Sequence, residues 1–262
     1  MGVINVTPDS FSDGGDFYAH ETAVAHGLRL AEAGADILDI GGESTRPGAE
    51  PVSEEEELRR VIPVIKALAS KVKVPLSIDT CKAGVAEAAL QAGASMINDI
   101  SAGRLDPELV GVAAHAKAPL ILMHMQGEPR TMQVNPTYQD LIGEIKAFLV
   151  KAAERAEKAG VSKEMIIIDP GIGFGKTFDH NLILINRLEE FINLGYPVML
   201  GASRKAFLGQ ILGGAPPKER DIATAAVIAL AAYKGAHVFR THNVDLAKQT
   251  LAVVKAVKQE KV

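Results

Sequence analysis

Cysteine and tryptophan are nearly absent from this sequence, which has one cysteine, Cys81, and no tryptophan among its 262 residues. A single cysteine excludes an internal disulfide, and no cluster of cysteine and histidine has the spacing of a zinc site. Cys81 follows Asp79 and Thr80 near a predicted strand end, where a nucleophile is conceivable. Because local sequence places no base beside it, a small residue in a packed turn is the favoured interpretation.

Long apolar runs are also missing. No stretch approaches the roughly 20 residues that span a bilayer, and the N-terminus has neither a basic region nor a signal-like apolar run. We therefore expect a cytoplasmic protein without a membrane partner. The net charge of −4 argues against nucleic acid as a partner. Four basic or potentially basic residues follow predicted strands and indicate a local cationic mouth for a small anionic ligand: Arg46, Lys205, Arg240 and His242.

Short apolar runs that lead into a polar residue recur along the chain, separated by helical patterns. They are Gly2–Val6 with Asn5, Ile37–Ile40 with Asp39, Leu76–Ile78 before Asp79, Met96–Ile97 before Asn98, Leu120–Met123 before His124, Met165–Ile168 before Asp169, Val198–Leu200 before Ser203 and Val238–Phe239 before Arg240. This alternation is typical of an α/β protein with a closed (β/α)₈ TIM barrel. The length matches one such domain of about 250 residues, and no linker interrupts it, so we predict a single domain over residues 1–262. In barrels the polar strand ends meet in one site.

The helical segments carry recognisable start and stop signals. Ser53 and Glu56 have the spacing of a capping box. Asn135 and Pro136 predict the start of a long helix that ends at Gly160. The alanine-rich stretch 222–232 is equally consistent with tight packing on the barrel and with a subunit contact.

Two sets of polar residues at the strand ends suggest two ligand groups. Asp79, Asn98, Asp169 and Lys205 offer acceptors and a cation that match a flat heterocycle, whose guanidine-like edge pairs bidentately with a carboxylate. The alternative is a structural ion pair between Lys205 and Asp169. The second set suits a diphosphate, with the Asn5 amide as an oxygen ligand for a divalent cation: Asn5, Thr45, Arg46, Arg240 and His242.

The glycine-rich segment Asp169–Thr177 invites comparison with a phosphate-binding loop. It does not fit, because Pro170 occupies the position of the first glycine. A tight turn that presents Asp169 and Phe174 to a ligand is favoured, and Phe174 either stacks on a flat ring or packs within the loop. For His124, at the fifth strand end, the sequence indicates no specific role.

Several motifs resemble, in order, those of the dihydropteroate synthase family. Asn5–Gly15 and Gly41–Gly48 are similar to its two signature loops, and later matches are Ser77–Thr80, Ile97–Ile100, His124–Gly127, Asp169–Thr177, Ser203–Lys205 and Arg240–His242. The resemblance covers nearly the whole chain. It implies a (β/α)₈ barrel, usually dimeric, that requires magnesium. The implied reaction joins a hydroxymethyl-dihydropterin diphosphate to 4-aminobenzoate in folate biosynthesis, and sulfonamides compete for the second site.

The resemblance also implies a role for each matching residue. Asp79, Asn98, Asp169 and Lys205 would hold the pterin, and Asn5, Arg46, Arg240 and His242 the diphosphate, with Asn5 as the magnesium ligand. Phe11, Thr45, Pro47, Phe174 and Ser203 would shape the 4-aminobenzoate site. Asp79, Lys205, Arg240 and His242 would carry the catalysis.

Two other functions fit parts of the sequence. One is a pterin-binding barrel that presents methyl-tetrahydrofolate to a corrinoid protein, which would not need the loop 44–47 or the pair Arg240 and His242. The other is a silent pterin-binding paralogue, which would be signalled by lost loop residues. Family members generally begin with about two short strands before the first barrel strand, whereas this sequence starts at Met1 directly before Gly2. We expect that hairpin to be absent here, and either the start is misplaced or the barrel floor is open.

Overall fold

The structure, a computed structural model, describes residues 1–7, 15–46 and 48–260. Its parallel strands are β1 Gly2–Asn5, β2 Leu38–Gly41, β3 Leu76–Asp79, β4 Met96–Asp99, β5 Leu120–Met123, β6 Ile166–Asp169, β7 Met199–Leu200 and β8 Val238–Phe239. Strands β1 to β6 pair in sequence order and β7 pairs with β8. Isolated parallel bridges from Ile168 to Val198 and from Gly2 to Thr241 join the two groups into a ring. The predicted closed (β/α)₈ barrel is confirmed.

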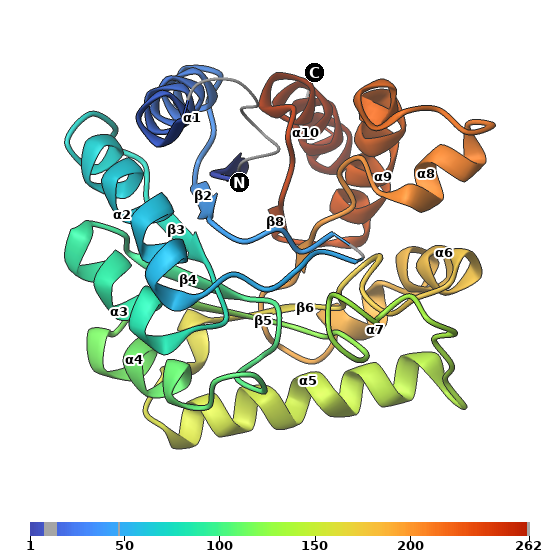
Figure 1. Cartoon of the computed structure of the whole chain (residues 1–262). Helices are drawn as coiled ribbons and strands as arrows, with labels where there is room; N and C mark the ends of the chain where they lie inside the picture. The colour runs from blue at the N-terminus through green and yellow to red at the C-terminus, as the bar shows by residue number, and fades with distance from the viewer. Residues whose placement is uncertain (8–14, 47, 261–262) are drawn as a thin grey trace.

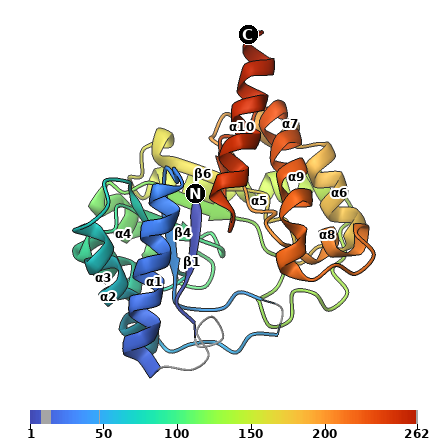
Figure 2. The same cartoon turned by 90° about the horizontal axis from the view of Figure 1, so that it is seen from above.

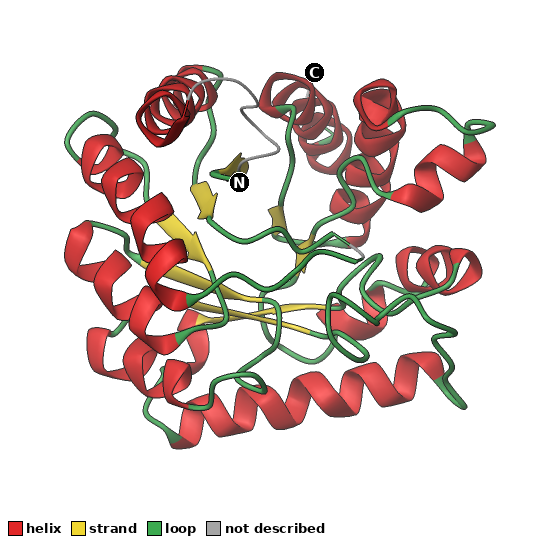
Figure 3. Cartoon of the chain, viewed as in Figure 1, coloured by secondary structure: helices red, strands yellow, loops and turns green. Residues whose placement is uncertain are grey.

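The helices surround this ring (Figures 1 and 3). They are α1 Gly15–Glu32, α2 Glu54–Ala69, α3 Ala83–Ala92, α4 Glu108–Ala116, α5 Leu141–Lys158, α6 Phe178–Asn186, α7 Glu189–Ile192, α8 Ala206–Ile211, α9 Asp221–Lys234 and α10 Val244–Gln259. Short 3₁₀ turns span Lys163–Met165 and Pro217–Arg220. Seen from above, α9 and α10 lie side by side, and α10 carries the C-terminal end away from the barrel (Figure 2). None of the helices in the described part of the chain is long and apolar enough to cross a membrane.

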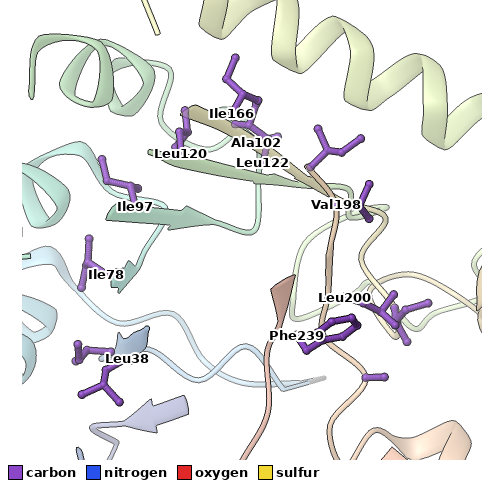
Figure 4. Packing of buried hydrophobic residues seen from close by; sticks show 14 of the residues in the cluster. Leu38, Ile78, Ile97, Ala102, Leu120, Leu122, Ile166, Val198, Leu200 and Phe239 are labelled. Atoms are coloured by element: carbon purple, nitrogen blue, oxygen red, sulfur yellow. The ribbon is translucent and has the colours of Figure 1, made fainter. Parts of the chain in front are cut away.

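Alternation along the strands separates the two largest of the three apolar clusters in the described residues. One set of strand residues packs with the helices, including Leu38, Ile78, Ile97, Leu120, Leu122, Ile166, Val198, Leu200 and Phe239 (Figure 4). A second cluster, made of Met1, Ile37, Met96, Ile121, Ile167, Met199 and Val238, comes from the intervening positions. Successive side chains of a strand point to opposite faces, so this second cluster fills the barrel interior.

The same alternation positions the polar residues. Asp39, Asn98, Asp169 and Arg240 lie two residues after members of the interior cluster, namely Ile37, Met96, Ile167 and Val238. They therefore point inward as well, one layer closer to the carboxyl ends of the strands. The apolar layer forms a floor, and the polar layer above it opens toward the loops.

Helix α5 starts later than the sequence predicts. Asn135 adopts a left-handed backbone conformation with φ of 51° instead of capping a helix. The helix begins at Leu141, where the Asp140 side chain accepts a hydrogen bond from the Gly143 amide. A capping side chain and a following proline were thus present at Asn135, but the better cap lies five residues further on. The predicted end is confirmed, since Gly160 follows the helix with φ of 104°.

The predicted capping box of α2 is half formed. The Ser53 side chain accepts a hydrogen bond from the Glu56 amide. The Glu56 carboxylate bonds instead to the guanidinium groups of Arg59 and Arg60. In the alanine-rich helix α9, Ala225 and Ala231 are buried, which supports packing on the barrel for that face.

Candidate active site

A buried acidic group in the barrel mouth surrounds the Arg240 guanidinium. Its Nε donates to Asp39 Oδ2 at 2.6 Å and its Nη2 donates to Asp79 Oδ2 at 2.7 Å. The Asn98 amide donates to the same Asp39 oxygen at 3.1 Å. These four side chains come from strands that are as many as 201 residues apart in sequence. The barrel closure between β8 and β1 brings them together.

Strand register explains why the acidic group is continuous. Asn5 pairs with Gly41, Gly41 with Asp79 and Asp79 with Asn98 along β1 to β4. Neighbouring strands lie about 4.8 Å apart, so polar side chains in one row are within reach of one ligand. Gly41 has no side chain, which leaves the space between Asn5 and Asp79 free of a bulky group.

Burial and charge strongly perturb these groups. Burial, together with the like charge of Asp39, raises the pKa of Asp79 to about 7, although Arg240 opposes the shift. Burial lowers the pKa of Arg240, but Asp39 and Asp79 outweigh it and raise that pKa above its usual value. Arg240 therefore stays charged, and Asp79 stands near the middle of its titration at neutral pH.

Lys205 approaches the site from the turn after β7. Its ammonium bonds to the Ile172 carbonyl and lies 3.9 Å from the centre of the Phe174 ring. Burial lowers the pKa of Lys205 to about 7 despite the attraction of Asp169. Among the described residues no carboxylate lies within ion-pair distance of this ammonium. The alternative of a structural ion pair between Lys205 and Asp169 is therefore not what the structure contains.

Asp169 is held by its own loop. One carboxylate oxygen, Oδ1, accepts a hydrogen bond from the Gly171 amide at 2.7 Å. Burial raises the pKa of Asp169 above its usual range, while the Gly171 amide and Lys205 oppose the shift. The second oxygen, Oδ2, lies 4.0 Å from where a side chain on Gly201 would begin. Glycine at position 201 thus leaves room beside Asp169 for a ligand.

His242 and Ser203 form a pair at the rim. The Ser203 hydroxyl lies 2.9 Å from His242 Nδ1 and accepts a hydrogen bond from the His242 amide at 3.1 Å. Burial, with the positive charges of Arg240 and Arg204, lowers the pKa of His242 to about 3. The imidazole is therefore neutral at physiological pH and can donate or accept a hydrogen bond but adds no positive charge.

Two buried acceptors in the site have no hydrogen-bond partner within the described part of the chain, Asp39 Oδ1 and Asn98 Oδ1. An unpaired buried acceptor costs about 1–3 kcal/mol. A ligand that brings N–H donors into the mouth would remove this cost. These two acceptors therefore make the site complementary to a donor-rich heterocycle.

The structure brings together most of the predicted residues. Asp79, Asn98 and Arg240 are in direct or shared contact, Asp169 and Lys205 flank them, and His242 joins Ser203. Asn5 lies in the same row, and Thr45 and the exposed Arg46 follow β2 in its loop. Phe11 and Pro47 lie outside the described residues. The Phe174 ring contacts the Lys205 ammonium and also packs against a buried cluster that includes Met123 and Met125, so its presentation to a ligand stays a prediction.

Two residues were missed or left unassigned by the sequence. Asp39 is a full member of the acidic group, and its separation of two residues from Ile37 was the available signal. His124 is buried, and its Nδ1 lies 3.0 Å from the Lys176 ammonium. Burial and the charge of Lys176 lower the pKa of His124 to about 2, so this histidine belongs to a buried polar contact.

Comparison with known proteins agrees with this geometry. Residues 1–242 match the family model described as "Pterin binding enzyme". A dihydropteroate synthase from Synechocystis sp. is 49% identical over 257 residues, which cover 98% of this chain and 89% of that protein.

Solved structures of similar proteins have the same fold. The Xanthomonas albilineans dihydropteroate synthase with 4-aminobenzoic acid has a TM-score of 0.93 at 49% identity and covers 98% of this chain and 92% of that one. The Yersinia pestis dihydropteroate synthase with a sulfonamide drug has a TM-score of 0.93 at 45% identity, with coverage of 99% and 94%. The chain therefore belongs to the dihydropteroate synthases, transferases of folate biosynthesis within the family of pterin-binding enzymes.

Proposed function

We propose that this site joins 6-hydroxymethyl-7,8-dihydropterin diphosphate to 4-aminobenzoate, giving 7,8-dihydropteroate and diphosphate. The observation that carries the proposal is the convergence of Arg240 with Asp39 and Asp79 at distances of 2.6 and 2.7 Å. A cation at this point lies between an acidic pterin site and the rim where a departing diphosphate would lie.

The pterin would occupy the acidic layer. Among the described residues, only Oδ1 of the Asp169 carboxylate has a backbone partner, and this carboxylate suits the guanidine-like edge of the ring, with two parallel hydrogen bonds. Asn98 Oδ1, buried and unpartnered among the described residues, supplies a further acceptor for a ring N–H. Lys205 would donate to ring acceptors. Asp79 would face the bridging carbon, where positive charge develops.

The diphosphate would lie on the rim. Arg240 Nη1 has no hydrogen-bond partner among the described residues, which leaves it available to phosphate oxygens. Arg46 lies exposed in the β2–α2 loop and acts electrostatically on His242. Arg46, Arg240 and the neutral His242 together provide the charge-assisted and neutral donors that a diphosphate requires.

Magnesium fits this arrangement as a partner of the substrate. No group of three or more histidine, cysteine or carboxylate side chains in the described residues could hold a metal. Asn5 offers one amide oxygen at the rim, and Mg²⁺ characteristically keeps several waters and binds through one or two protein oxygens plus substrate phosphates. When bound, the ion would supply charge neutralisation for the diphosphate.

The 4-aminobenzoate would bind between the loops and the turn after β6. Phe174 presents an apolar ring, and Ser203 and Thr45 provide hydroxyls for a carboxylate. Phe11 and Pro47 are proposed from the resemblance to complete this site. The related enzyme from Xanthomonas albilineans that was solved with 4-aminobenzoic acid supports a site for this substrate.

The reaction would then need no covalent intermediate on the protein. Arg240 stabilises negative charge on the leaving oxygen as the carbon–oxygen bond breaks. The ring delocalises the resulting positive charge, which the ionised Asp79 stabilises. The amine of 4-aminobenzoate, oriented by the Phe174 and Ser203 side, attacks the carbon and releases a proton to solvent.

A single assay tests the proposal. The protein is mixed with the pterin diphosphate, Mg²⁺ and 4-aminobenzoate, and released diphosphate and dihydropteroate are measured while each component is omitted in turn. Dependence on all three supports the synthase. Pterin binding without turnover would indicate a silent binding module, and methyl transfer to a corrinoid without diphosphate release would indicate the methyl-carrier class.

We also propose a homodimer formed through α9 and α10. An apolar stripe with helical spacing is exposed on α9, comprising Ile222, Leu230 and Tyr233, and Val253 and Val257 are exposed on the adjacent α10. Leu230→Glu should halve the molar mass measured by light scattering, whereas Val134→Glu, at an equally apolar exposed loop position, should leave it unchanged. A monomeric parent protein would contradict the proposal.

The substrate also bears on location. A diphosphate is confined by its charge to the aqueous compartment in which it is made. We therefore propose that the reaction takes place in the cytoplasm, as expected from the sequence. Detection of the protein mainly in a membrane or secreted fraction would contradict this.

A further inference from the structure

Lys176, in the glycine-rich turn between β6 and α6, has a role that the proposed reaction leaves open. Its side chain is only 3% exposed. Its ammonium has three partners: His124 Nδ1 at 3.0 Å, the His124 carbonyl at 3.2 Å and the Phe174 carbonyl at 2.9 Å. All three are neutral acceptors. Burial lowers the pKa of Lys176 well below its usual value, and the three bonds offset the cost of burying this polar group.

The turn that carries Lys176 lies directly on the end of β5. Gly171, Gly173 and Gly175 have φ of 70°, 80° and 63°, which side chains rarely tolerate. A Cβ on Gly171 would stand 2.0 Å from the His124 carbonyl oxygen, and one on Gly175 would stand 2.6 Å from the Gln126 carbonyl oxygen. The glycines allow the turn to approach the end of β5 this closely, but they have no side chains that could bond to it. Lys176 makes polar bonds that join the turn to the end of β5.

The same turn provides the surroundings of Lys205. The Ile172 carbonyl accepts a hydrogen bond from the Lys205 ammonium, and the Phe174 ring lies 3.9 Å from it. The Gly171 amide orients Asp169. Any loosening of the turn against β5 would therefore displace a ring, a carbonyl and a carboxylate that face the ligand.

We infer that Lys176 is a positioning residue, which ties the β6–α6 turn to β5 and so fixes Phe174 and Lys205 at the junction of the two substrate sites. The inference rests on the proposed function for the identity of those sites. Lys176 contacts no proposed substrate position and acts only through its neighbours.

The test compares Lys176→Met with Lys176→Gln. Methionine and glutamine are both one atom shorter than lysine, so they match each other in length. Methionine removes all donors, while glutamine keeps two N–H donors without the charge. Lys146→Met is the matched control, because Lys146 is half-buried on α5 and pairs with Glu190 at 3.3 Å away from the mouth. Steady-state assays give kcat and KM for each substrate, and circular dichroism establishes that each variant is folded.

In Lys176→Met, KM for 4-aminobenzoate should rise by about 10-fold or more, since small misplacements of a positioned group cost up to about 10²-fold. Lys176→Gln should recover part of the loss, and Lys146→Met should match the parent. Folded Met and Gln variants with parental KM values would overturn the inference. If the Met variant does not fold, the Gln variant alone decides between a raised and a parental KM.

A double-mutant cycle tests the route through Phe174. If Lys176 acts by holding that residue, Lys176→Met should add little to the KM of Phe174→Leu. Fully additive effects would overturn the coupling.

Hydrogen exchange provides a readout that needs no turnover. Amides of residues 171–177 should exchange faster in Lys176→Met than in the parent and in Lys146→Met, because the turn has lost its side-chain tie to β5. Unchanged exchange in this segment overturns the positioning role whatever the activity. Absence of turnover in the parent protein would instead overturn the proposed function and leave the exchange result to judge Lys176.

Discussion

Two cations approach the same mouth and are held in opposite ways. Arg240 donates to two buried carboxylates, Asp39 and Asp79. Lys205 bonds to the Ile172 carbonyl and lies over the Phe174 ring, and within the described residues it has no ion-pair partner. One positive charge is fully compensated by the protein, and the other is bonded only to neutral groups.

This difference separates a fixed charge from an adjustable one. Asp39 and Asp79 raise the pKa of Arg240 against the effect of burial, so its charge is constant. Burial lowers the pKa of Lys205 to about 7, so its protonation depends on what binds beside it. We expect Arg240 to be part of the folded framework as well as of catalysis, and Lys205 to serve the ligand alone.

Substitution of Arg240 should have the largest effect. Arg240→Ala removes the cation that stabilises the departing diphosphate and should lower turnover by about 10²–10³-fold. It also leaves Asp39 and Asp79 buried without their counter-ion, which should destabilise the fold by about 3–5 kcal/mol. Diphosphate release and denaturant unfolding measure the two effects.

The control for Arg240 is Arg187→Ala. Arg187 is half-exposed and pairs with Glu190 on the surface, where an ion pair contributes about 0–1 kcal/mol. If Arg240→Ala has the stability of the parent, Asp39 and Asp79 do not need their counter-ion for folding. The proposed difference between Arg240 and Lys205 would then be wrong.

Lys205→Met should also lower turnover, but unlike Arg240→Ala it should not destabilise the fold. Activity should fall by about 10²-fold, since the pterin loses a positioned donor. The free energy of unfolding at pH 7 should stay the same or rise, because a buried cation without a counter-ion is replaced by an apolar chain of similar length. Lys66→Met, on the exposed surface of α2, is the control. A clear loss of stability in Lys205→Met would contradict the view that Lys205 serves the ligand alone.

The pH dependence of stability should isolate the same residue. The pKa of Lys205 is about 7 in the folded protein, whereas an ordinary lysine, as in the unfolded chain, has a pKa of 10.5. Between these values the unfolded chain binds more protons than the folded one, so this group makes the parent more stable as pH rises through that window. The stability advantage of Lys205→Met should therefore shrink by at least about 1 kcal/mol between pH 7 and pH 10. Unfolding free energies of the two proteins, measured in parallel, give the difference, and a constant gap would contradict the lowered pKa.

The contrast between the cations also shows where sequence reasoning was sufficient. The strand–helix alternation predicted the barrel, and the polar strand ends predicted one site at its mouth, with Asp79, Asn98, Asp169 and Lys205 in one set and Arg240 in the other. Each of these residues ends or follows an apolar run, so its place at the mouth depends on local pattern alone. The group that each cation contacts depends also on how the strands are brought together in the barrel.

Asp39 shows why the rest could not be predicted. It lies inside a strand, and its contact with Arg240 depends on closure of the barrel across 201 residues. The predicted start of α5 was also wrong. The helix is capped by Asp140, and the segment before it is held by long-range bonds of Thr137 to the Gln126 side chain and of Tyr138 to the Gly175 carbonyl. Side-chain pairing across the barrel and choices between near-equal caps are decided by long-range packing.

Asp39→Asn should have the smallest effect and the most specific one. The amide keeps the shape of the side chain but removes the negative charge that raises the pKa of Asp79, and it leaves Arg240 to pair mainly with Asp79. Both changes lower the pKa of Asp79 below about 7. If ionised Asp79 is required, the acid limb of kcat/KM should move to lower pH by about half a unit or more.

Asp36→Asn provides the control for this shift, because it removes the same charge from an exposed carboxylate that pairs with Lys248 outside the mouth. Its acid limb should coincide with that of the parent. At pH 8, where Asp79 is ionised in all three proteins, the rates should differ only a few-fold. An acid limb in Asp39→Asn that coincides with the other two would mean that a group other than Asp79 controls it, and Asp169, whose pKa burial also raises, would take its place in the mechanism.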